Sequence, residues 1–148
     1  DSDTLILDEL CDVPFDFSRP TASLRRTATW PQPLGPGHHY ADIWKDCYDI
    51  CGVDYTSSLD EQFSAQDWRR YLYFNASFFF YESPTKFGAR FLEFAQKIKN
   101  STRPRITRQS LDPWLDQVVL PMVIHSFGGG KTHTCPGMAG RKDQLSLS

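Results

Sequence analysis

The side chains of this sequence with the richest chemistry are its cysteines, Cys11, Cys47, Cys51 and Cys135. An even number of cysteines spread over 148 residues is typical of a disulfide framework, and we expect two disulfides. Cys47 and Cys51 are one helical turn apart, so they project side by side and are poorly placed to bond to each other. We expect one to bond to Cys11 and the other to Cys135. The alternative is four unpaired buried thiols.

Metal binding would need a cluster of ligating side chains at suitable spacing. Two groups could be considered, one near the start of an expected helix and one near the end of the chain: His38, His39, Asp42 and Asp46, and then His125, His133 and Cys135. Neither has the paired spacing of a structural zinc site. We therefore expect no metal and no cofactor.

A glycine-rich run near the end of the chain has the order of a phosphate-binding loop. An apolar stretch is followed by Gly128-Gly129-Gly130-Lys131-Thr132, but His125 stands where the motif needs a glycine. Pro136 follows too soon for the long helix that the motif requires. There is no GxSxG signature either, so the sequence indicates no catalytic residue. A small secreted hydrolase using His38 or His39 is kept as an alternative.

Both asparagines of the chain begin glycosylation sequons, Asn75-Ala76-Ser77 and Asn100-Ser101-Thr102. The first residue is Asp1 rather than Met, as expected after removal of a leader. Together with the cysteines, these features predict a glycoprotein of the secretory pathway, secreted or extracellular. The alternative location is inside the cell, as a subunit of a large complex.

Composition limits the class of protein. A chain with 40% hydrophobic and 14% aromatic residues has the material for one globular domain. A net charge of −2 argues against a general nucleic-acid binder. No stretch reaches the ~18 apolar residues of a membrane span. We therefore expect neither a nucleic-acid partner nor a membrane span.

The elements that would carry these residues suggest three regions. Residues 1–37 form an acidic arm and a Pro-rich connector, residues 38–127 a compact helix-rich domain, and residues 128–148 a Gly-rich flexible tail. The predicted fold class is α+β and helix-rich, in a small single domain.

Helices are predicted from about His39 to Cys51 and over residues 84–99, the second with Ser83 as N-cap. A third start is indicated by the capping-box spacing of Ser58 and Glu61. The aromatic residues 68–81 suit a buried strand or a buried helix, with a bend at Asn75.

Nearer the C-terminus, Ser110 or Asp112 with Pro113 begins another helix. Pro121 should end or kink this helix, and residues 122–124 would follow as a short strand. Between the last two helices, Arg103, Arg105 and Arg108 form a basic loop. We expect this loop to be solvated; contact with an anion is the alternative.

Many aromatic side chains and no reaction signature together predict a protein-binding module. Three aromatic residues recur at four-residue steps on the first helix and three lie in the arm and connector: Tyr40, Trp44 and Tyr48, then Phe15, Phe17 and Trp30. We expect them to bind another protein, with the oligomeric state open. The alternatives are that the helical stripe is core, and that the chain is an accessory subunit wrapping a larger assembly.

Overall fold

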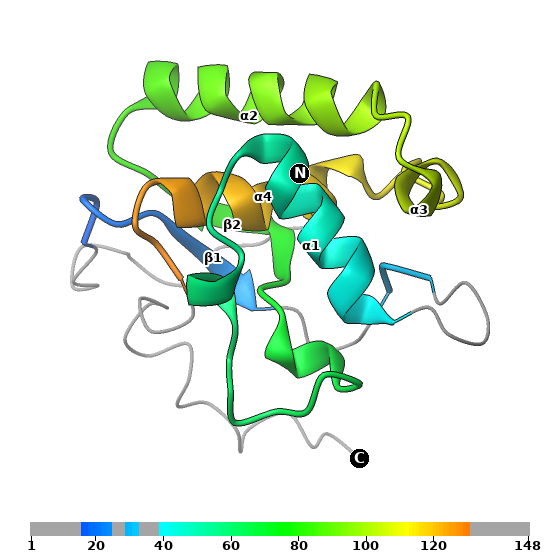
Figure 1. Cartoon of the computed structure of the whole chain (residues 1–148). Helices are drawn as coiled ribbons and strands as arrows, with labels where there is room; N and C mark the ends of the chain where they lie inside the picture. Colours follow the sequence, from blue (N-terminus) through cyan, green and yellow to red (C-terminus); the bar gives the residue numbers. More distant parts are fainter. Residues whose placement is uncertain (1–15, 25–28, 33–38, 131–148) are drawn as a thin grey trace, which may run out of the picture.

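The computed structural model describes residues 16–24, 29–32 and 39–130. About half of these residues are helical, and two short strands form an antiparallel sheet, so the α+β, helix-rich class is confirmed. The elements in chain order are β1 (Thr21–Leu24), α1 (Tyr40–Cys51), η1 (Thr56–Ser58), η2 (Trp68–Arg70), β2 (Phe74–Phe80), α2 (Pro84–Lys99), α3 (Pro104–Thr107) and α4 (Leu115–Ser126) (Figure 1).

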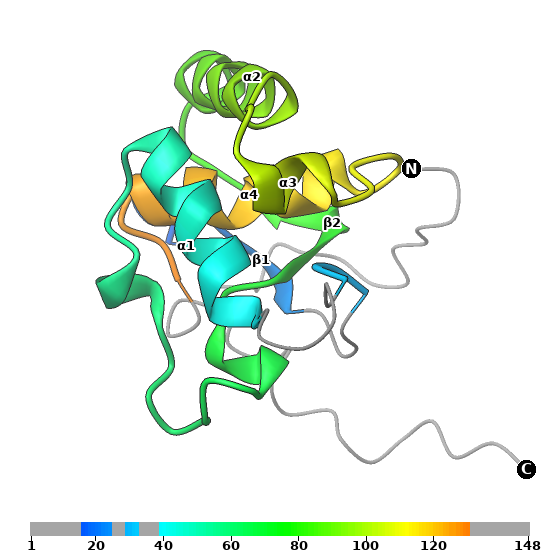
Figure 2. The ribbon, with the colours of Figure 1, turned by 45° about the vertical axis from the view of Figure 1, so that its right-hand side comes forward.

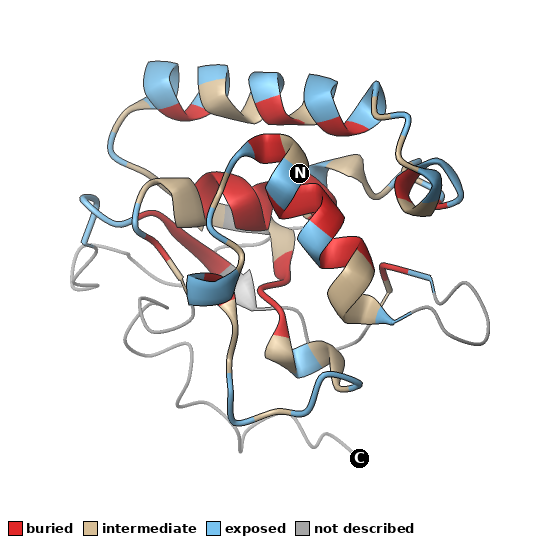
Figure 3. Ribbon diagram, in the orientation of Figure 1, coloured by how far each residue is buried: buried red, intermediate tan, exposed pale blue. Residues whose placement is uncertain are grey.

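Helix α4 is the centre of the molecule. All seven residues from Val118 to Ile124 are buried, and the helix packs against α2 on one side and β2 on another (Figure 3). Pro121 lies inside this helix, so the predictions that the helix would end there and that residues 122–124 would form a strand are wrong. The cost of one missing backbone hydrogen bond is outweighed because the surrounding elements bury every side chain of this segment.

Helices α1 and α2 begin and end as the sequence predicts. Gly52 ends α1 with φ 70°, a left-handed conformation that glycine adopts without steric cost, and its N–H bonds the Asp49 carbonyl at 3.3 Å. The Ser83 hydroxyl caps α2 by accepting a hydrogen bond from the Lys86 N–H at 3.3 Å, and Pro84 occupies its first turn. Helix α2 lies across the top of α4 and α1 (Figure 1).

The aromatic segment forms strand β2, paired antiparallel with β1. Thr21 and Ala22 oppose Phe80 and Phe79, but the next residue of β1, Ser23, opposes Asn75. The extra residues of β2 therefore interrupt the ladder beside Asn75. The predicted bend is replaced by this irregular pairing inside a continuous strand.

The capping-box prediction at Ser58 is wrong. The Ser58 hydroxyl donates to the Tyr55 carbonyl at 2.7 Å and so stabilises the preceding 3₁₀ turn. The residues after it form turns, for example with the Phe63 N–H bonded to the Asp60 carbonyl at 3.2 Å. A local side-chain bond thus competes with helix initiation.

Part of the Pro-rich connector belongs to the core. The Trp30 ring meets Trp44 edge-on, with centroids 5.0 Å apart, and its Nε1 donates to the Ser110 carbonyl at 3.1 Å. Next to it, Gln32 and Gln109 exchange two hydrogen bonds, of 2.7 and 2.8 Å. The connector therefore ties the last loop before α4 to the first helix. The rest of the arm and the tail beyond residue 130 lie outside the described residues.

No helix in the described part of the chain combines the length and the apolar character needed to cross a bilayer.

Candidate functional site

An open pocket of about 440 Å³ lies where the C-terminal ends of α1 and α4 meet the face of α2. Its walls come from these three helices and the turn after α1: Cys51, Gly52, Val53, Asp54, Ser57, Arg90, Phe94, His125 and Ser126. It joins an imidazole, a carboxylate, a hydroxyl and a guanidinium with one aromatic ring. Such a mixture of polar groups over an apolar wall suits a polar ligand.

His125 is held by hydrogen bonds on both ring nitrogens. Its Nδ1 lies 3.4 Å from the Gly129 carbonyl, and its Nε2 lies 2.9 Å from the Ser57 hydroxyl. A carbonyl oxygen only accepts hydrogen bonds, so Nδ1 carries the proton. Nε2 faces Ser57, in the turn that follows α1. The edge of the Tyr48 ring packs on the imidazole at 6.1 Å between centroids. This combination fixes both the tautomer and the ring plane.

Asp54 extends this arrangement into a chain of three groups, Asp54–Ser57–His125. Hydrogen bonds from the Ser57 side chain and the Thr56 N–H lower the pKa of Asp54, and the charge of His125 adds to the effect. Ser57 has a single hydroxyl proton. If it is donated to Asp54, Nε2 must donate to Ser57 and His125 is an imidazolium; if it is donated to Nε2, His125 is neutral. The direction of the Ser57 hydroxyl and the proton on Nε2 are therefore linked through the 2.9 Å contact.

Arg90 enters the pocket from α2 between two aromatic rings. Its guanidinium carbon lies 5.4 Å from the Phe94 centroid and 5.5 Å from the Phe127 centroid. Cation–π contacts of this kind orient the guanidinium plane. Arg90 thus supplies a positioned positive charge beside the Asp54–Ser57–His125 chain.

A second hollow, of about 580 Å³, lies among Ser64, Gln66, Asp67, Trp68 and Arg69. The Arg69 guanidinium is already ion-paired with Asp67 at 2.6 Å within that loop. Since its charges neutralise each other and a single loop builds it, the pocket around His125 is the better candidate.

The cysteines described by the structure are both free thiols. Cys47 and Cys51 are buried on one stripe of α1 and are not bonded to each other, which confirms that part of the prediction. Burial raises the pKa of Cys47 well above its usual value and that of Cys51 to about 12. The predicted outward disulfides are unsupported, because these sulfurs pack inside the core; Cys11 and Cys135 lie outside the described residues.

Most of the residues predicted to bind a partner contribute to the core instead. Trp30, Trp44 and Tyr48 are at most 2% exposed. Tyr40 is half-buried against Tyr71, with centroids 6.4 Å apart. These positions match the alternative interpretation of the stripe as core, because the rings fill the space beside α4. Phe17 is 49% exposed and packs edge-on against Phe80; Phe15 lies outside the described residues.

The predicted sequons occupy two different settings. Asn75 lies within β2 and is half-buried, whereas Asn100 is exposed at the end of α2.

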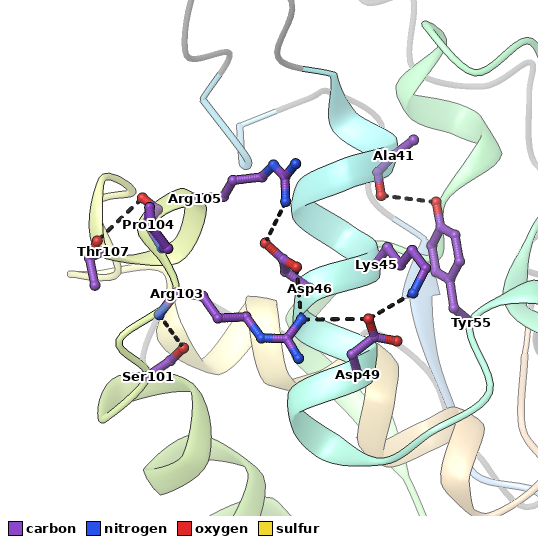
Figure 4. A network of polar contacts seen from close by, with 10 residues as sticks. All are labelled: Ala41, Lys45, Asp46, Asp49, Tyr55, Ser101, Arg103, Pro104, Arg105 and Thr107. Carbon is purple, nitrogen blue, oxygen red and sulfur yellow. Dashed lines mark hydrogen bonds and ion pairs between the residues drawn. The ribbon is translucent and has the colours of Figure 1, made fainter.

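The predicted basic loop is tied to α1 by ion pairs. Arg103 Nη1 lies 2.8 Å from Asp46 Oδ1 and 3.5 Å from Asp49 Oδ2, and Arg105 Nη1 lies 3.3 Å from Asp46 Oδ2 (Figure 4). The prediction that Arg103 and Arg105 are solvated is therefore only half right, since both also contact carboxylates. Their partner is the chain itself, because α3 lies beside α1 in both views (Figures 1 and 2).

The two groups considered for metal binding are described only in part. Within residues 16–24, 29–32 and 39–130, no three side chains of ligating type come together. Asp46 is engaged by arginines. His38, His133 and Cys135 lie outside the described residues.

Three members of the pocket, Asp54, Ser57 and Arg90, were not identified from the sequence. Cys51 was singled out as a disulfide candidate, and His125 through the glycine run that follows it and as a possible metal ligand. The usable signal was a polar, ionisable residue placed directly after seven apolar ones, which marks the point where a buried helix reaches the surface. The partners of His125 are 68 and 4 residues away and no local pattern connects the first of them.

Comparison with known proteins gives one match. A family model described as the Rhodobacterales glycosyltransferase domain covers residues 1–128. No curated protein and no solved structure matches the chain. A bacterial family argues against the predicted eukaryote-style secreted glycoprotein, so that prediction is corrected. Since the match spans most of the sequence, the chain belongs to the Rhodobacterales glycosyltransferase domain family.

Proposed function

We propose that the chain serves glycosyl transfer and that the pocket around His125 binds part of the sugar-bearing substrates. Membership of a glycosyltransferase family supports the reaction class. The observation that carries the assignment of the site is the positioned His125 imidazole, which is held through both ring nitrogens and lines an open polar pocket beside Ser57 and Asp54.

The reaction class defines what the pocket must do. In glycosyl transfer an acceptor hydroxyl attacks the anomeric carbon of an activated sugar, the bond to the leaving group breaks, and the leaving group keeps the electron pair. The hydroxyl proton must then go to a base. With Nδ1 bonded to the Gly129 carbonyl, His125 Nε2 is the atom able to receive it. An acceptor hydroxyl that displaces the Ser57 hydroxyl would occupy the same 2.9 Å contact.

The test compares variants of one histidine with a matched control. The full chain is titrated with a panel of nucleotide sugars, with and without Mn²⁺, and release of the nucleoside diphosphate is followed. His125→Gln should weaken binding or turnover by about tenfold or more, whereas His39→Gln, at the exposed start of α1, should change neither. A wild-type chain that neither binds nor turns over any donor contradicts the proposal, as does an unaffected His125 variant.

A further inference from the structure

Arg90 is held in the pocket by rings that are themselves immobilised. Phe94 is 2% exposed. Phe127 stacks on Phe87 with centroids 6.0 Å apart, and Phe87 stacks on Tyr81 at 4.6 Å. The rings of Tyr81, Phe87 and Phe127 thus form a stacked series, and the guanidinium contacts the last of them. Such a side chain loses little conformational freedom when it binds a ligand.

The hydrogen-bond donors of Arg90 remain available. Its Nε lies 3.6 Å from Glu93 Oε2, beyond hydrogen-bond distance, and Glu93 Oε1 is bonded to Lys97 at 2.7 Å. Within the described residues, Nη1 and Nη2 make no hydrogen bond, and the side chain is 40% exposed at the pocket. The guanidinium carbon lies over the rings of Phe94 and Phe127, and these cation–π contacts use none of its N–H donors.

The charges around this guanidinium are balanced before a ligand enters. Asp54 and Glu93 are negative, while Lys97 is positive and His125 can become so. The C-terminal ends of α1 and α4 lie nearby, and some of their last carbonyls are already bonded. Gly52 and Val53 N–H groups cap α1, and Phe127 and Gly128 N–H groups cap α4.

We propose that Arg90 binds the phosphate group of the sugar donor through its two terminal nitrogens. This assignment rests on the proposed function and names the chemical class that the pocket recognises, an anion with two oxygens in one plane. A bidentate guanidinium contact fits phosphate oxygens in a way that a lysine ammonium cannot. Arg90 and His125 both line this pocket.

The experiment titrates the full chain with inorganic pyrophosphate by calorimetry. Arg90→Gln should weaken binding by about tenfold or more, the loss expected for one charge-assisted bidentate contact. Arg90→Lys should also weaken it, because the charge remains but the fork is lost. Arg108→Gln, an exposed arginine at the end of α3, is the matched control and should stay within about twofold of the wild type. Circular dichroism checks that each variant is folded.

The results for Arg90 and for His125 are independent. If Arg90→Gln binds pyrophosphate as well as the wild type does, or if the wild type does not bind it, the phosphate assignment is wrong. Should nucleotide sugars then still bind in a manner sensitive to His125→Gln, the proposed function stands without Arg90. Titration with a nucleoside lacking phosphate provides a second control, since Arg90→Gln should not alter that affinity.

Discussion

At the level of single residues, burial and hydrogen bonding decide which ionisable groups can act. Cys47 and Cys51 are of a reactive type, yet the core around α1 raises their pKa values. Asp54 is of a common surface type, yet hydrogen bonds from Ser57 and Thr56 of η1 lower its pKa. The sequence shows the residue type but not these surroundings. That is why the cysteines looked chemically important and Asp54 did not.

The thiol of Cys47 should be unreactive while the chain is folded. Desolvation, with smaller effects of Cys51 and Asp46, raises its pKa, so almost no thiolate is present at neutral pH. In a Cys11→Ser, Cys135→Ser background, iodoacetamide should label neither remaining cysteine in native buffer and both in concentrated urea. Rapid native labelling located at Cys47 by mass spectrometry would contradict this expectation.

Asp54 should make the stability of the chain depend on acid pH. Its pKa in the folded chain is below the ordinary value of 3.8, so the ionised form is favoured by folding. The stabilisation is complete above pH 3.8 and is lost as the pH falls through the lower folded value. The melting temperature of Asp54→Asn should therefore lie below that of the wild type at pH 6 and converge with it at strongly acid pH. Glu82→Gln, an exposed carboxylate, is the control and should show no such convergence.

At the level of elements, the sequence predicts a helix well when its own residues specify both ends. Ser83 and Pro84 start α2, and Gly52 stops α1. Prediction failed where contacts from distant segments decide the outcome. Pro121 is a local signal against helix, but α2 and β2 bury the segment around it. The irregular pairing beside Asn75 likewise depends on β1, more than 50 residues earlier.

The attachment of α3 to α1 should depend mainly on Asp46. The Asp46 side chain is 12% exposed and contacts two arginines. The Asp49 side chain is 38% exposed and lies farther from Arg103, at 3.5 Å. Asp46→Asn should reduce the free energy of unfolding by about 1–2 kcal/mol, less than for a fully buried pair because the arginines are largely solvated. Asp49→Asn should have a smaller effect. Urea unfolding at low and high salt measures both, and equal effects would contradict the ranking.

At the level of the whole molecule, residues that look like a connector are structural. Trp30 is 1% exposed and Trp44 lies between it and Tyr73, with centroids 5.0 and 5.8 Å away. The sequence pattern separated the connector from the domain because prolines and glycines flank Trp30. Only the folded chain shows that this ring crosses to α1. The pocket around His125 is likewise formed by segments that are far apart in the sequence, so no local pattern predicts it.

Removing either tryptophan ring should therefore cost much of the stability. Trp30→Ala and Trp44→Ala should each lower the free energy of unfolding by about 3–5 kcal/mol, the range for a large ring removed from a packed core. Phe17→Ala, at a 49% exposed position, should cost less than about 1 kcal/mol. Urea denaturation followed by fluorescence provides the comparison. A Trp30 variant as stable as the wild type would contradict the conclusion that this part of the connector belongs to the core.

The complete burial of the central part of α4 determines which substitutions the chain tolerates there. A helix on the surface of a protein tolerates substitution with a repeat of about 3.6 residues, because one face is free. Over residues 118–124 every side chain is buried, so no position is free and that repeat should vanish. The test is a scan of all single substitutions in which the amount of folded protein is measured. Tolerated positions should recur along α2 with the helical repeat, whereas substitutions at residues 118–124 of α4 should all reduce the amount of folded protein. Within the family, we expect differences in the pocket to come from substitutions in the elements around α4 and seldom from substitutions in its central turns.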